Sequence, residues 1–263
     1  MNMLESTGLT PYEYRFSGIS RLIGKSGFSS LKEAHILIVG AGGVGSWAVE
    51  ALARSGVGHF TLVDPDEVCL SNTNRQLHAL LPDIGQLKIE LLKKRVLMIN
   101  PECKVDTIPE FYTKESSSFI LAHKYSYVID AIDSLQYKCH LIASCRDLGI
   151  PVITIGASGG RFDPTKIQVA DLGEAYNDKL LMRLRKKLRN DYGFAEGKNI
   201  FFNVDCVFSS ERAHYPTLDG EICETKQANS NLKLDCESGL GTATFVTGTF
   251  GFVAAYRILS KFK

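Results

Sequence analysis

The sequence predicts an α/β protein with a Rossmann-like, doubly wound and mainly parallel sheet that helices cover on both faces. Three observations support this fold class: strand-like and helix-like segments alternate through the first half, a glycine cluster joins the first strand to the first helix, and acidic residues follow two strands. Alternating strands and helices favour a parallel sheet, because each helix returns the chain across one face. We expect one such domain with an elaborated C-terminal part.

The predicted strands are short runs of apolar and β-branched residues. They lie at 35–39, 60–63, 104–108, 125–129, 151–155, 166–169 and 200–204. The predicted helices show apolar residues at helical spacing. They lie at 46–55, 86–99, 136–148 and 178–189, with an apolar helix within 240–259. Residues 211–235 are predicted as a long polar loop. We divide the chain into an N-terminal helical segment, residues 1–30, expected at a dimer contact, and a single domain, residues 31–263.

Composition excludes several classes of protein. The 263 residues carry 30 Lys and Arg against 29 Asp and Glu, and this net charge of +1 gives no global nucleic-acid signal. The seven cysteines contain no C-x-x-C pair, so we expect neither a disulfide framework nor a zinc ion. No signal-peptide pattern is evident at the N-terminus. We expect a cytoplasmic protein, in which the apolar C-terminal helix is the one segment that could contact a membrane surface.

A glycine cluster occupies residues 36–50, ILIVGAGGVGSWAVE. Gly40, Gly42 and Gly45 satisfy the G-x-G-x-x-G pattern of nucleotide-binding loops. Glycine lets the backbone approach a phosphate closely, and the following helix N-terminus offers free N–H groups. The loop alone leaves open whether the ligand is a dinucleotide such as NAD or FAD, or ATP.

The residues that follow favour a triphosphate. Asp64 ends the next predicted strand, where a carboxylate can accept hydrogen bonds from ribose hydroxyls. Four polar side chains are then expected at the carboxyl end of the sheet: Asn72, Arg75, Gln76 and Lys88. The two cations among them suit a triphosphate, because they can neutralise a leaving pyrophosphate. Taken singly, a surface salt bridge for Arg75 and a solvated position for Lys88 are the alternatives.

Two acids lie at the end of a later strand, in YVIDAIDS. A carboxylate that faces a triphosphate is a natural magnesium ligand, and Asp133, further into the loop, is the preferred candidate. Capping of the helix that begins near Ser134 is the alternative role for whichever acid, Asp130 or Asp133, is not the ligand.

Four segments in this order, GAGGVGSW, DPDEVCLSNTNRQ, GQLK and DAIDS, resemble the E1-like activating enzymes. That family includes ubiquitin-activating enzymes and the bacterial enzymes that adenylate sulfur-carrier proteins. The resemblance implies the E1-like fold, ATP binding and adenylation of a carboxylate. It assigns the phosphate loop to Gly40, Gly42, Gly43 and Gly45. It assigns ribose to Asp64, the phosphates to Asn72, Arg75, Gln76 and Lys88, and magnesium to Asp133.

Departures from the family pattern narrow the branch. Paired zinc-binding C-x-x-C motifs are absent, and the chain is too short for catalytic-cysteine and ubiquitin-fold domains. RFSGISRLIG, VFSSE and LDCESGLGTATFVTGTFGFVAA are similar to the tRNA-modifying branch, the threonylcarbamoyladenosine dehydratases. This similarity implies that ATP activates the carboxylate of the threonylcarbamoyl group on adenosine 37, and that a nitrogen of the same group closes a ring as AMP leaves. An activator of a sulfur-carrier or ubiquitin-like protein, and an NAD-binding dehydrogenase or regulatory module, remain alternatives.

Several hypotheses concern residues outside the nucleotide motifs. An N-terminal arginine of E1-like enzymes can reach the ATP of a partner subunit, so we expect a homodimer with Arg21 in a catalytic role, beside Arg75, Lys88 and Asp133. Cys236 could accept an acyl group, or sulfur from a sulfur-transfer partner, although a buried apolar thiol is the alternative. A structural monovalent cation is a further hypothesis.

A basic helix is the predicted contact for tRNA. In LLMRLRKKLR, residues 180–189, helical spacing turns Leu180, Leu184 and Leu188 inward. The outward cations Arg183, Lys186 and Lys187 would then contact tRNA phosphates, with Arg161 and Lys166 extending the patch. A solvated basic face is the alternative.

Overall fold

The chain folds around one seven-stranded sheet in a computed structural model that describes residues 8–197, 200–217, 219–224 and 240–263. The strand order is β3-β2-β1-β4-β5-β7-β6. All neighbouring pairs are parallel except β6 and β7, so the sheet is parallel with one antiparallel edge strand. The predicted Rossmann-like fold class is therefore confirmed.

The strands are short, and most begin or end within two residues of the predicted bounds. They are β1 (His35–Val39), β2 (His59–Val63), β3 (Lys104–Ile108), β4 (Tyr127–Asp130), β5 (Val152–Ile155), β6 (Ile167–Asp171) and β7 (Asp205–Ser209), with the small hairpin strands β8 (Tyr215–Pro216) and β9 (Ile222–Cys223). The helices are α1 (Pro11–Arg15), α2 (Ser17–Lys32), α3 (Gly45–Arg54), α4 (Lys88–Ile99), α5 (Lys114–Ile120), α6 (Leu135–Asp147), α7 (Lys179–Tyr192) and α8 (Thr244–Leu259).

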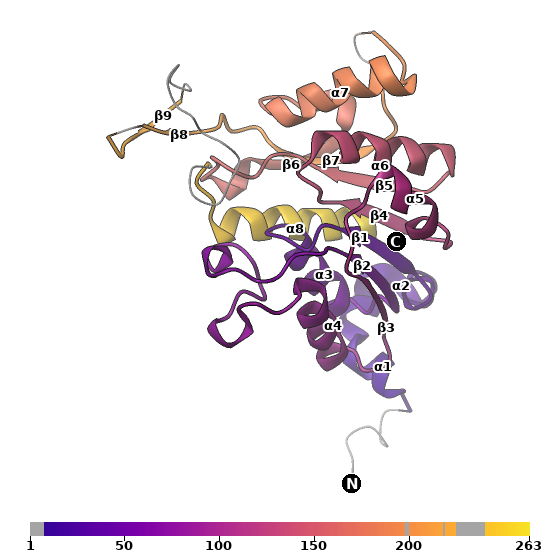
Figure 1. The fold of residues 1–263 in the computed structure, drawn as a ribbon. Helices are drawn as coiled ribbons and strands as arrows, with labels where there is room; N and C mark the ends of the chain where they lie inside the picture. Colours follow the sequence, from indigo (N-terminus) through magenta and orange to yellow (C-terminus); the bar gives the residue numbers. More distant parts are fainter. Residues whose placement is uncertain (1–7, 198–199, 218, 225–239) are drawn as a thin grey trace.

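Helices cover both faces of the sheet (Figure 1). The alternating side chains of β1 illustrate the two cores, because Ile36 and Ile38 pack with α3, α4 and α8, whereas Leu37 and Val39 pack with α5, α6 and α7. A central parallel strand is apolar on both faces for this reason.

The strand order reverses between β1 and β4. β2 lies on one side of β1 and β4 on the other, and Val39 pairs with Asp130 across the reversal. At such a point the connections that follow the two neighbouring strands run to opposite faces of the sheet. A crevice opens between them at the carboxyl ends of the strands. The glycine cluster follows β1 and DAIDS follows β4, so the fold brings these two motifs to this crevice.

The N-terminal helices are continuous with the domain. Thr10 caps α1 through a capping box with Glu13. The proposed boundary at residue 30 lies inside α2, whose Leu31 belongs to the core beneath α3. A Cβ at Gly27 would overlap the carbonyl oxygen of Phe262, so α2 also packs closely against the C-terminal residues.

Three predicted details are wrong or incomplete. The strand predicted at 200–204 is instead β7, which begins at Asp205. The N–H groups of Phe202 and Val204 donate to the Asp171 carboxylate, at 2.8 and 3.2 Å, so they take part in no strand pairing. Helix α5 was not predicted, and the described residues of the polar stretch at 211–235 include the β8–β9 hairpin.

Within the described residues, no helix is long and apolar enough to cross a membrane.

Candidate functional site

The glycines of the cluster divide into two pairs by what surrounds them. Gly40 has a φ of 98° and would carry a Cβ 2.7 Å from the Ala131 carbonyl oxygen, while a Cβ at Gly45 would overlap the Gly40 carbonyl. These two glycines are required for the turn itself. Gly42 and Gly43 meet only side-chain atoms, at 3.4 Å or more. The second pair therefore leaves a bare backbone surface that a ligand can approach.

Helix α3 begins at Gly45, immediately after this surface, and no side chain caps its N-terminus. Uncapped N–H groups and the positive end of the helix dipole together attract anions. The loop has the form of a phosphate-binding cradle.

Asp64 lies at the end of β2 with its carboxylate turned toward the cradle. One oxygen accepts from the Ala41 N–H at 2.6 Å, and the other from the Asp66 N–H at 2.9 Å. Burial raises the pKa of Asp64, although the Lys88 charge and the two N–H donors act against this rise. Each carboxylate oxygen has a second lone pair that remains able to accept a ribose hydroxyl.

The segment from 69 to 76 lies over the cradle. The Asn72 amide oxygen accepts from the Cys69 N–H at 3.0 Å, and the Arg75 guanidinium donates to the Ser71 carbonyl at 2.6 Å. Gln76 is buried, and its amide oxygen has no hydrogen-bond partner among the described residues. A buried polar atom without a partner indicates that a ligand or water completes the site.

The C-terminal helix holds this segment in place. The carbonyl oxygen of Arg75 accepts from the Trp47 indole at 3.0 Å and from the Thr247 hydroxyl at 3.2 Å. The Thr244 hydroxyl donates to the Asn74 carbonyl at 2.6 Å. Trp47 belongs to α3; we call the Thr244 and Thr247 contacts the α8 clamp, because they join residues 74–75 to the start of α8.

Lys88 begins α4, and its ammonium contacts the Asp66 carboxylate at 2.7 Å. The Lys88 side chain is only 7% exposed, whereas the Asp66 side chain is 53% exposed. The cation thus lies at a buried position and is paired with one exposed acid. Sequence reasoning missed Asp66, although its place two residues after Asp64 on the same loop was a usable signal.

The two acids after β4 have different surroundings. Asp130 is fully buried, and Lys138 of α6 contacts its carboxylate at 2.9 Å. Lys138 also donates to the carbonyls of Asp130 and Ile132, so it fixes the start of the loop. Asp133 is exposed and makes no hydrogen bond or ion pair within the described part of the chain. Neither acid caps α6, because Ser134 is its N-cap residue and no side chain bonds there.

His78 was not singled out by the sequence. It is buried two residues beyond Gln76, and neither ring nitrogen has a partner among the described residues. Burial, together with the Lys88 charge, lowers the pKa of His78 to about 4. The imidazole is therefore neutral at pH 7.

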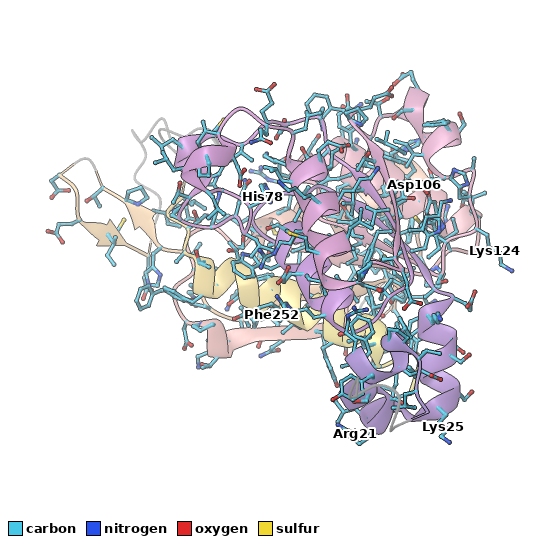
Figure 2. The ribbon with its side chains drawn as sticks, turned by 90° about the horizontal axis from the view of Figure 1, so that it is seen from below. Arg21, Lys25, His78, Asp106, Lys124 and Phe252 are labelled. Atoms are coloured by element: carbon cyan, nitrogen blue, oxygen red, sulfur yellow. The ribbon has the colours of Figure 1, made fainter. Side chains whose placement is uncertain are left out.

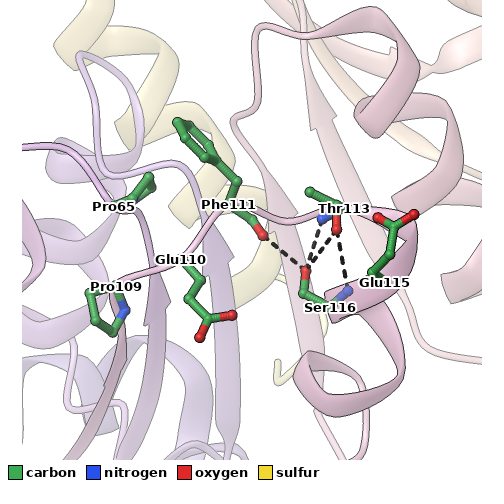
Figure 3. Close-up of a pocket in the computed structure, with 7 residues that line it drawn as sticks. All are labelled: Pro65, Pro109, Glu110, Phe111, Thr113, Glu115 and Ser116. Carbon is green, nitrogen blue, oxygen red and sulfur yellow. Dashed lines mark hydrogen bonds between the residues drawn. The ribbon is translucent and has the colours of Figure 1, made fainter.

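An open depression of about 570 Å³ lies beside Asp64 (Figure 3). Pro65 and Pro109 lie on one side of it and Thr113, Glu115 and Ser116 on the other, with Glu110 and Phe111 between them (Figure 3). The Ser116 hydroxyl donates to the Phe111 carbonyl at 2.9 Å, which ties this rim to the start of α5. The depression has the position expected for the nucleoside end of a nucleotide whose ribose is bound by Asp64.

Two predicted site residues lie away from the crevice or outside the described residues. Arg21 is exposed on α2, on another side of the molecule from His78 (Figure 2). Within its own chain it is therefore not a member of the nucleotide site. Cys236 lies outside the described residues.

Helix α7 exposes part of the predicted basic face. Arg183 and Lys186 are exposed, whereas Lys187 forms an ion pair with Asp191. The apolar face consists of Leu181, Leu184 and Leu188, so the inward placement of Leu180 was wrong by one residue. Arg161 is also not on this surface, because it is buried and donates to the Glu211 and Asn177 carbonyls.

The site combines a glycine cradle at a helix N-terminus, a buried acid placed to bind ribose, and two cations. These features define a nucleotide-binding protein of the Rossmann-like class whose ligand carries several phosphates. The chain belongs to the ThiF family, whose sequence profile matches residues 16–263. A tRNA threonylcarbamoyladenosine dehydratase from Escherichia coli is 47% identical over 251 residues, covering 95% of this chain and 94% of the relative.

Two solved structures support the same relationship. They are of the E. coli tRNA N6-threonylcarbamoyladenosine dehydratase TcdA, one in complex with ATP and one in complex with AMP. Each is 44% identical, has a TM-score of 0.84, and covers 95% of this chain and 94% of the solved one.

Proposed function

We propose that this chain uses ATP to dehydrate and cyclise N6-threonylcarbamoyladenosine at position 37 of tRNA, through adenylation of the threonylcarbamoyl carboxylate. The observation that carries the proposal is a pair of cations at the crevice: Arg75 lies against Gly43 of the cradle, and the Lys88 charge acts on Asp64, which binds the Ala41 N–H. A relative of 47% identity over nearly the whole chain bears the name of this dehydratase, which supports the tRNA substrate.

The residues present fit ATP. Gly42 and Gly43 leave room for phosphates, Asp64 keeps free lone pairs for ribose, and the unpartnered oxygen of Gln76 is available to a donor. Lys88 would exchange the exposed Asp66 carboxylate for a phosphate oxygen, and its ammonium is near enough to Asp64 for its charge to oppose the rise in that carboxyl's pKa. Arg75 stays anchored through its carbonyl while its guanidinium turns toward the phosphates.

A carboxylate reacts poorly with nucleophiles because its leaving group would be oxide, so the reaction must first activate it. A carboxylate oxygen attacks the α-phosphorus of ATP, and the bond from that phosphorus to pyrophosphate breaks. A nitrogen of the same threonylcarbamoyl group then attacks the activated carbonyl carbon and loses its proton to solvent, and AMP leaves with one carboxylate oxygen. Arg75 and Lys88 neutralise the charge on the departing pyrophosphate. The nucleophile is tethered, so ring closure has a high effective concentration without a nucleophile from the protein.

A magnesium ion would fit at Asp133, whose carboxylate is exposed at the crevice, and would neutralise phosphate charge there. Arg183 and Lys186 are the proposed tRNA contacts. Four expectations stay predictions. Two concern partners: a homodimer in which Arg21 reaches the partner's ATP, and a role for Cys236 with a sulfur-transfer partner. The others are a structural monovalent cation, and a cytoplasmic protein whose helix α8 contacts a membrane peripherally.

Nucleoside mass spectrometry on tRNA incubated with the protein and ATP tests the proposal. We expect ATP-dependent loss of one water from threonylcarbamoyladenosine. Lys88→Ala and Asp133→Ala should abolish this change, while the matched control Lys94→Ala, on the exposed side of the same helix as Lys88, should keep it.

The outcomes separate the function from the site. An unchanged nucleoside with the wild-type protein would overturn the function, and pyrophosphate exchange stimulated by a small carrier protein but not by tRNA would establish the alternative activator. Full activity in Lys88→Ala or Asp133→Ala would refute only the assignment of that residue.

A further inference from the structure

Three potential metal ligands lie on neighbouring strands far from the nucleotide loop in the chain. His35 and His59 are the first residues of β1 and β2 and are paired in register, and Asp106 of β3 pairs with Thr61. The twofold alternation of strands turns these side chains to the face covered by α5–α7, where Leu37 and Val63 also point. The cluster lies toward the amino ends of β1 and β2, whereas the cradle lies at the carboxyl end of β1.

The geometry is close to that of a coordination site. His59 Nε2 lies 2.7 Å from Asp106 Oδ2, and one ligand atom of each of the three residues lies within 4.8 Å of the other two. Ligand atoms around a tetrahedral zinc ion, with bonds of about 2.0–2.1 Å, are separated by about 3.3 Å. To bind one ion, the two stacked rings would have to rotate apart, because their lone pairs lie in nearly parallel planes, and His35 Nε2 would leave the Thr61 hydroxyl, 2.8 Å away.

The two imidazole rings of the cluster lie directly against each other. The His35 and His59 rings are stacked with centroids 3.4 Å apart and planes 8° apart, so two protonated imidazoles would repel strongly. A neutral imidazole offers a lone pair to a metal at pH 7.

A metal ion could enter the cluster from solvent, and one nearby cation would compete with it for the carboxylate. The Asp106 side chain is 47% exposed, so an ion can reach the cluster from solvent. Lys104 lies 3.4 Å from the Asp106 carboxylate, but its side chain is 68% exposed and can turn away. The exposed His123 ring lies 6.2 Å from that of His35, which places a further imidazole nearby.

We propose that His35, His59 and Asp106 form a binding site for one divalent transition-metal ion of the Zn²⁺ and Co²⁺ class. Two imidazoles and one carboxylate suit such ions better than Mg²⁺ or Ca²⁺, which prefer oxygen ligands alone. The ion would join β1, β2 and β3 at one end of the sheet. The sequence does not reveal the site, because its ligands are separated by 24 and 47 positions and only strand register brings them together.

Titration of the full-length protein with Zn²⁺ by calorimetry, and with Co²⁺ by visible absorption, tests the proposal. We expect one saturable site whose affinity falls at least about tenfold in His59→Asn and in Asp106→Asn, the lower range of loss seen even for outer partners of metal ligands. Lys104→Ala should strengthen binding, because it removes a cation from beside the ligand carboxylate. Wild-type thermal stability should rise with Zn²⁺, and this rise should be lost in Asp106→Asn.

His214→Asn is the matched control, since His214 pairs with a carboxylate elsewhere, at 3.5 Å from Glu211. Its metal affinity should equal that of the wild type. The proposal is overturned if the wild type shows no saturable binding, if Asp106→Asn binds as tightly as the wild type, or if the cobalt spectrum has the strong charge-transfer bands of cysteine ligation.

Discussion

Replacement of Lys138 by Met should give a pH-dependent loss of stability. The Lys138 and Asp130 side chains are both fully buried, with 2.9 Å between ammonium and carboxylate. Burial raises the pKa of Asp130, and the Lys138 charge, with the Thr154 hydroxyl, acts against this rise. Without Lys138 the carboxyl must take up a proton in the folded protein, because an unpaired buried charge costs more than protonation.

The expected loss of stability is the free-energy cost of taking up that proton. Protonating a carboxyl of ordinary pKa costs about 1.4 kcal/mol per pH unit above about 3.9, hence about 4 kcal/mol at pH 7 and about 1.5 kcal/mol at pH 5. A carboxyl whose pKa is higher in the folded than in the unfolded state binds protons more tightly when folded. Its contribution to stability is therefore present at low pH and lost as the pH rises.

Urea unfolding of the wild type and of Lys138→Met at pH 5, 6, 7 and 8 measures the effect. The matched control is Lys138→Met combined with Asp130→Asn, which has no titrating carboxyl and should show a pH-independent difference from the wild type. Equal stability loss in Lys138→Met at all four pH values would refute the reasoning.

Other predictions concern the cradle, the basic helix and the buried imidazole. Gly45→Ala should abolish ATP binding in a calorimetric titration, because its Cβ would overlap the Gly40 carbonyl. Arg183→Glu should weaken tRNA binding in a filter assay while ATP affinity stays unchanged. Arg185→Ala should instead lower the melting temperature, since Arg185 donates to two backbone carbonyls. In NMR titrations His78 should stay neutral until about pH 4. Because its folded pKa is depressed, its contribution to stability should fall as the pH drops from about 6.5 to 4, and His78→Gln should reduce that pH dependence.

Sequence reasoning predicted the elements whose local pattern and tertiary environment agree. The run HILIV is apolar enough for a central strand, and β1 has the bounds predicted for it. The stretch containing Phe202 and Val204 has the same local character, yet its N–H groups bond to the distant Asp171 carboxylate. A side chain that competes for backbone donors is invisible to periodicity, which explains why β7 was placed too early.

The same limit applies to the candidate site. The glycines, Asp64, Arg75 and Lys88 were all predicted, because each lies in a motif at the end of a strand or the start of a helix. Asp66, the partner of Lys88, and Lys138, the partner of Asp130, were missed, since neither ion pair follows from the spacing of a motif. Strand register likewise determines the metal cluster.

The α8 clamp has a consequence for how the protein is made. The contacts from Thr244 and Thr247 join the segment over the cradle to residues about 170 positions later in the chain. A ribosome delivers those residues long after the glycine cluster and Asp64, so the segment that carries Arg75 is fixed only once α8 has been made. Nucleotide binding should thus depend on synthesis and docking of the C-terminal helix, which also supplies buried residues to the core on one face of the sheet.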